Sequence, residues 1–143
     1  MIPSQLQILV ESQPGSIHRV SREAVAAALF DLKVPLESEF AEFFFTYTIT
    51  FFRSEVSDEE LCDIADPTTE IGVGTKFVHE VWDLPNRFVC FSSGQGEGAY
   101  LYETTTGHVW DFDLASRSDF LAGKQRPKWQ SFFEFMTWYL AEP

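Results

Sequence analysis

The chain has 143 residues, 45% of them hydrophobic and 16% aromatic, which is enough apolar material for one domain, expected over residues 1–143. No apolar run approaches the roughly 20 residues that span a bilayer, and the first residues lack the basic segment of a signal peptide, so we expect a cytoplasmic protein. The formal net charge of −12 disfavours binding to nucleic acid or to anionic membranes and favours a cationic partner.

The first helix is expected over residues 18–34. Ser21 can cap its N-terminus, the apolar residues that follow recur at helical spacing, and Pro35 ends it. The preceding residues 4–16 fit either a strand or a helical turn.

A second helix is expected over residues 36–46, because Phe40, Phe43, Phe44 and Tyr47 follow the i, i+3, i+4, i+7 pattern. The residues after Thr46 favour a strand, so the end of this helix stays open. Residues 57–66 alternate weakly between apolar and polar and predict a short strand.

Negative charge is concentrated in the middle of the chain. Residues 36–70 hold ten acidic residues against Arg53 alone, a net charge of −9. Two interpretations remain open: a solvated face that keeps the protein soluble, or a surface for a cationic partner.

A helix over residues 74–82, stopped by Pro85, and a strand over residues 87–93 come next. Residues 99–103 and 108–113 flank the turn sequence TTTG and predict a β-hairpin. The three alternate glycines at 94, 96 and 98 lie between two strands. A phosphate-binding loop would lead into a helix, so we interpret these glycines as a turn.

A basic loop then leads into a final helix over residues 129–142, and its charged residues are Arg117, Lys124, Arg126 and Lys128. Helices, then a hairpin, then a helix, without βαβ alternation, predict an α+β fold. We therefore expect N-terminal helices, an antiparallel β-sheet with a hairpin, and a C-terminal helix.

Few residues indicate chemistry. Asp111 and Asp113 share one face of their strand, where they could hold a divalent ion or act as acid and base. The alternative is that they form the solvent-exposed side of a strand whose other side, with Trp110 and Phe112, is buried. Cys62 and Cys90 are expected to be buried, reduced thiols. The three histidines show no metal-ligand spacing, so we expect no metal. No sequence motif marks an enzyme active site.

The order of features over residues 33–140 resembles the SUKH superfamily, whose best-known branch is named for the yeast cell-wall assembly regulator. The matching pattern is a Leu-Pro-like start and aromatic helix, a glycine turn, an aromatic strand, a Gly-x-Val hairpin and a closing helix that begins with Ser-Phe. The residues that carry it are Pro35, Phe40, Phe43, Phe44, Gly94, Gly96, Gly98, Tyr100, Leu101, Tyr102, Thr106, Gly107, Val109, Ser131 and Phe132. The chain departs from the family at residues 48–50, where Asn-Gly is common, and at Tyr102-Glu103, where Asp is common.

This resemblance implies a bacterial immunity protein, which binds a cognate toxin protein and neutralises it by occlusion, with no catalytic centre and no cofactor. The alternatives are a regulatory or interaction module of the same fold that binds a non-toxin protein, and an enzyme that uses Asp111, Asp113 and a histidine. For the contact surface with a cationic toxin we predict acidic residues, with two tyrosines as aromatic anchors if they are exposed. These candidates are Asp58, Glu59, Glu60, Tyr100, Tyr102, Asp111 and Asp113.

Overall fold

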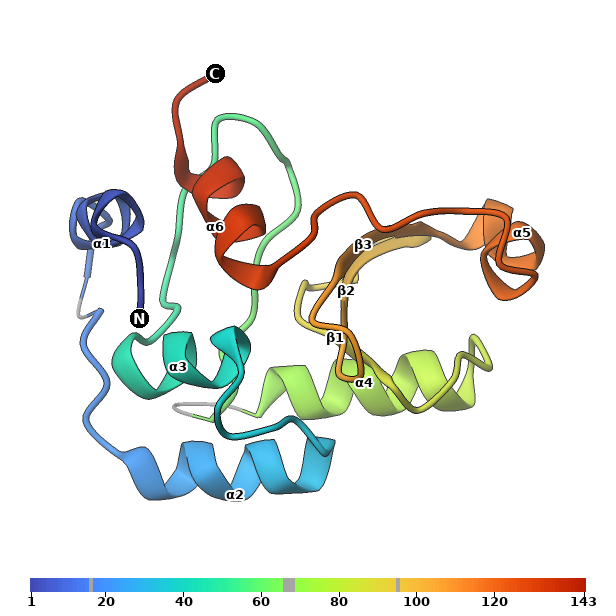
Figure 1. Cartoon of the computed structure of the whole chain (residues 1–143), viewed down its shortest axis with the longest axis horizontal. Helices are drawn as coiled ribbons and strands as arrows, with labels where there is room; N and C mark the ends of the chain where they lie inside the picture. Colours follow the sequence, from blue (N-terminus) through green and yellow to red (C-terminus); the bar gives the residue numbers. More distant parts are fainter. Residues whose placement is uncertain (16, 66–68, 95) are drawn as a thin grey trace.

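A three-stranded antiparallel sheet separates two groups of helices in the computed structural model, with α6 on one side of the strands and α5 on the other (Figure 1). The structure describes residues 1–15, 17–65, 69–94 and 96–143. Within these residues the chain forms an α+β domain, as the sequence predicts. Its elements are α1 (Ser4–Glu11), α2 (Arg22–Leu32), α3 (Glu39–Thr46), α4 (Glu70–Glu80), β1 (Phe88–Cys90), β2 (Gly98–Glu103), β3 (Val109–Asp113), a 3₁₀ turn η1 (Leu114–Ser116), α5 (Arg117–Leu121) and α6 (Phe132–Leu140).

The sheet has the order β1-β2-β3, and the predicted hairpin is confirmed as β2 and β3, with Tyr102 opposite Val109 and Gly98 opposite Asp113. The preceding turn holds Gly94 and Gly96 at φ angles of +65° and +79°, which explains the glycines there. They shape a turn between two strands, as expected.

Each face of the sheet has its own hydrophobic core. On one face, aromatic residues of α3 and α6 pack on β2: Phe40 stacks on Tyr102 with ring centroids 4.7 Å apart and meets Phe132 at 4.9 Å. On the other face, Phe120 of α5 and Trp82, which follows α4, pack against Phe112 of β3. The central strand is therefore buried on both sides.

Serine residues cap the two helices that build the first core. The Oγ atom of Ser38 accepts the N–H of Ala41 at 3.1 Å, and that of Ser131 accepts the N–H of Glu134 at 3.2 Å. Ser21 occupies the N-cap position of α2, as predicted, but its side chain accepts no hydrogen bond there. For the residues before α2, the sequence left a strand or a helical turn open, and the structure has a helix there, α1.

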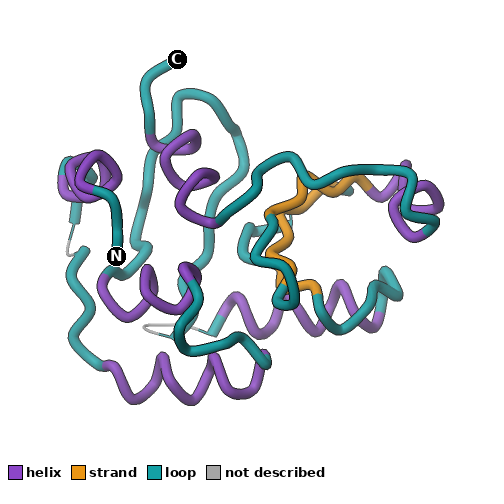
Figure 2. The backbone as a smooth tube through the Cα atoms, viewed as in Figure 1, coloured by secondary structure: helices purple, strands orange, loops and turns teal. Residues whose placement is uncertain are grey.

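The strand predicted over residues 57–66 is wrong as far as residue 65; residue 66 lies outside the described residues. The connection from α3 to α4 is a long loop that arches around α6 (Figure 2). Among its described residues, the one backbone bridge is between Leu61 and Ser92, just beyond the end of β1. The hydroxyls of Ser54 and Ser57 accept the backbone N–H groups that follow them, which fixes turns in place of a strand ladder.

The other predicted elements differ from the observed ones at their ends. Helix α4 begins at Glu70, before the predicted start at residue 74, and the basic loop contains the short helix α5. Helix α6 begins only at Phe132 because Ser131 caps it.

Candidate functional site

Four of the predicted contact residues meet at one end of the hairpin. Asp111 lies directly opposite Tyr100 in the β2–β3 register, and the loop before residue 60 crosses over this point. Two hydrogen bonds pin the loop: the hydroxyls of Ser57 and Tyr100 are 2.5 Å apart, and the Tyr139 hydroxyl donates to the Glu59 carbonyl at 2.6 Å. The backbone of Asp58 and Glu59 is thereby fixed near Tyr100, whose hydroxyl feels the charges of Asp58, Glu59 and Asp111.

Asp113 extends the same group of acids. Because side chains alternate along a strand, it shares the face of Asp111, and it lies opposite Gly98, where an added Cβ would stand 3.7 Å from the Glu59 carboxylate. We call Asp58, Glu59, Asp111 and Asp113 the acidic cluster. Glu59 is half-buried and the other three side chains are exposed.

The electrostatics of the acidic cluster reflect this crowding. Burial, together with a smaller contribution from the negative charge of Asp111, raises the pKa of Glu59 to about 7. Burial also raises the pKa of the Tyr100 hydroxyl, with added contributions from the charges of Glu59, Asp111 and Asp58, although its hydrogen bond to Ser57 opposes the rise. Three carboxylates therefore act on the same point, and a cation placed there would relieve their repulsion.

The structure adds Lys128 to this site. Its ammonium lies 3.5 Å from the Asp111 carboxylate and sits over the rings of Trp129 and Trp138, at 5.0 and 5.5 Å from their centroids. Sequence reasoning placed Lys128 in the basic loop without a partner. The available signal was its position directly before Trp129, whose ring can attract a cation.

The two tyrosines are not exposed anchors. Tyr100 and Tyr102 are only 5% and 2% exposed, because β2 is the central strand and helices cover both of its faces. The open alternative, that the tyrosines belong to the core, is the correct one. On the predicted buried side of β3, Phe112 is buried and Trp110 is partly buried; in α6, Phe132 and Phe133 are buried and Trp138 is partly buried.

Glu60 lies apart from the acidic cluster. It lines a groove of about 650 Å³ beside α4, together with both cysteines. The cysteines are free and buried, as predicted. Burial raises the pKa of Cys62 to about 12 and that of Cys90 to about 11, which keeps both thiols protonated near neutral pH.

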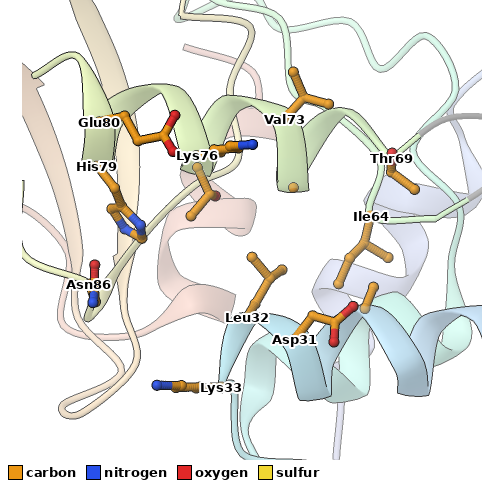
Figure 3. A pocket seen from close by; sticks show the side chains of 13 residues that line it. Asp31, Leu32, Lys33, Ile64, Thr69, Val73, Lys76, His79, Glu80 and Asn86 are labelled. Atoms are coloured by element: carbon orange, nitrogen blue, oxygen red, sulfur yellow. The ribbon is translucent and has the colours of Figure 1, made fainter.

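A second hollow, of about 710 Å³, lies between α2 and α4 (Figure 3). Asp31 of α2 and Lys33, the C-cap residue of that helix, line it on one side, and Lys76 and Glu80 of α4 line it on the other, so its charges are balanced. On α4, the His79 Nε2 atom bonds the Phe88 carbonyl at 2.7 Å. That contact ties α4 to β1. Among the described residues, no three His, Cys, Asp or Glu side chains gather closely enough to hold a metal ion.

Comparisons with protein-family models, with curated proteins and with solved structures found no match to this chain. No helix of the described residues is both long and apolar enough to cross a membrane.

Proposed function

We propose that the protein is an immunity protein that binds a cognate toxin through the acidic cluster and neutralises it by occlusion. The convergence of Asp58, Glu59 and Asp111 on one point, with Asp113 beside them, is the observation that carries this proposal. The SUKH-like order of motifs supports it at the level of the sequence. The partner is expected to present Lys and Arg residues.

The physical advantage of such a cluster is selective association. Matching an acidic patch to a cationic surface raises the association rate from about 10⁵–10⁶ M⁻¹s⁻¹ by orders of magnitude at low salt. Glu59 contributes more in the complex than in the free protein, because a nearby cation favours its charged form. The tight hydrogen bonds of Ser57 and Tyr139 hold the loop in place, so little ordering is needed on binding.

The test begins with capture of partners from the native cell by the tagged protein, with washes at about 50 mM and about 500 mM salt. The Debye length falls from about 14 Å to about 4 Å over this range. We expect one stoichiometric cationic partner that is toxic when expressed alone, harmless when co-expressed, and less well retained at high salt. If no partner binds, the proposal fails.

Two triple variants with the same net charge then test the surface. The first carries Asp58→Asn, Asp111→Asn and Asp113→Asn, and the second carries Glu11→Gln, Glu23→Gln and Glu142→Gln at exposed positions elsewhere. Association of the cluster variant should slow by about tenfold at low salt, whereas the control variant should change by less than about twofold. Equal effects would show that only the overall charge matters and that the chosen surface is wrong.

The regulatory module is the second candidate, and the same acidic cluster favours it equally. A captured partner that is harmless without this protein would favour that function over immunity.

A further inference from the structure

Helix α4 exposes a stripe of apolar side chains. Val73 and Phe77 are 68% and 45% exposed, and Val81, the C-cap residue, is 63% exposed. Their i, i+4, i+8 spacing places them on one line along the helix. The opposite side of α4 is also apolar, because Ile71 and Val78 are buried in the two cores. A helix that is apolar on both sides is normally covered on both.

The stripe borders the groove beside α4, which is built to receive side chains. Its walls include Val73, Phe77 and Trp82 on one side and the end of β1 on the other, and buried Cys62 and Cys90 also line it. Trp82 is fixed by edge-on contact with Phe77 and by packing on Phe112, both at 5.5 Å between ring centroids. Trp82 is therefore packed between Phe77 and Phe112 in this wall.

Gly74 keeps this groove open. It lies in the groove lining over β1, and an added Cβ would stand 3.6 Å from the Cys90 Sγ atom. A longer side chain at this position would occupy the space that an incoming residue needs.

The charges around the groove indicate what it binds. Glu60 and Glu70 are both exposed on its lining, and none of the described residues that line it is a Lys or an Arg. An apolar groove bounded by two uncompensated carboxylates is complementary to an apolar segment that also carries positive charge.

We propose that this groove docks an amphipathic, basic helix of a partner protein. Its apolar residues lie against Val73, Phe77 and Val81, and its Lys or Arg side chains reach Glu60 and Glu70. A second copy of this chain fits poorly, because its net charge of −12 and its own carboxylates would meet the same sign of charge. Val78 and Trp82 pack in the core on one face of the sheet, whereas Tyr100, which lies opposite Asp111, packs in the core on the other face, so this inference does not rest on the acidic cluster.

A pair of synthetic helical peptides tests the docking surface. Both carry Leu at i, i+3, i+4 and i+7; one has Lys at its polar positions and the other has Glu. Each is titrated into the isotope-labelled full chain at low salt and followed by amide NMR. We expect the Lys peptide to bind at least about tenfold more tightly, with shifts confined to α4 and to residues 60–62 and 92–94. Equal affinity for both peptides, or no binding of either, would overturn the proposal.

Variants of the chain locate the contact. Val73→Ser with Phe77→Ser should weaken Lys-peptide binding about tenfold, whereas Phe30→Ser, at a side chain 82% exposed on α2, should not change it. Glu60→Gln with Glu70→Gln should remove the preference for Lys over Glu. The variant that neutralises Asp58, Asp111 and Asp113 should bind the Lys peptide as the parent does, which separates this test from that of the proposed function.

Two results would assign the surface differently. Shifts centred on the acidic cluster would show that the Lys peptide binds there by charge alone. Sedimentation that reveals a dimer of the parent chain, dissolved by Phe77→Ser, would make a second copy the occupant. Either result overturns the proposal.

Discussion

Arg19→Met should strongly destabilise the protein, because it removes one half of a buried ion pair. The guanidinium donates to both carboxylate oxygens of Asp63, at 2.8 and 2.9 Å, and to the carbonyls of Phe44 and Tyr47, at 2.8 and 3.0 Å. The two charged side chains are only 1% and 3% exposed. The pair joins the segment before α2 to the end of α3 and to the long loop.

The expected loss follows from what remains after the substitution. Asp63 keeps two hydrogen bonds from backbone N–H groups, those of Ile49 at 2.8 Å and Ala65 at 3.3 Å, but no cation. Breaking a buried pair in this way costs about 3–5 kcal/mol, a large share of the roughly 5–15 kcal/mol that stabilises a domain. At about 2–4 °C per kcal/mol for a chain near this size, Tm should fall by about 6–20 °C.

Urea denaturation at pH 7 measures this loss, with Arg22→Met as the matched control. Arg22 is exposed and donates one hydrogen bond, to the Phe45 carbonyl at 3.2 Å, so its loss should cost less than about 1 kcal/mol. The double variant Arg19→Met/Asp63→Asn should be more stable than the sum of the single variants predicts, since the introduced amide is uncharged and its oxygen still accepts a backbone N–H. Equal losses for the two Arg variants, or strict additivity, would refute this reasoning.

Two further changes have defined outcomes. Because folding raises the pKa of Glu59 to about 7 from an ordinary 4.5, the stability that its protonated form contributes is complete below pH 4.5 and is lost as the pH rises through 7. Glu59→Gln should therefore be more stable than the parent above pH 7, by about 1 kcal/mol after allowance for solvent screening, and the difference should shrink toward pH 4.5; a pH-independent difference in urea midpoint would contradict this. Gly72→Ala should stabilise the protein by up to about 1 kcal/mol, since nothing lies within 4 Å of the added Cβ on α4. Gly107→Ala, at a φ of +80°, should instead lower the urea midpoint, and the Gly72 expectation fails if both variants lower it.

The sequence predicts the second half of the fold well because its patterns are local. Alternation through Val109, Trp110, Asp111 and Phe112 separates the two faces of β3 correctly, and Ser131 marks the start of α6. The wrong strand over residues 57–66 has a non-local cause. A strand requires a backbone partner along its whole length, and the described residues of this loop form such a bridge only at Leu61.

The acidic middle of the chain does not fold into one surface, which sequence counting could not show. Asp63 pairs with Arg19 in the interior, Glu39 accepts the N–H of Phe133 at 2.9 Å, and Glu42 pairs with the N-terminal ammonium at 3.0 Å. These contacts join residues far apart in the chain. The acidic cluster instead combines two neighbouring residues of the loop with two residues of β3.

Helix α4 shows why a binding surface is harder to predict than a core. The inward residues Ile71 and Val78 and the outward residues Val73 and Phe77 are all apolar, so periodicity alone supports either side as the buried one. The position of the sheet decides between them, because β1 takes up one side of the helix and leaves the other in solvent. Packing within this fold therefore accounts for the inward apolar residues of α4 but not for the exposed apolar stripe. A partner that covers the stripe would account for it.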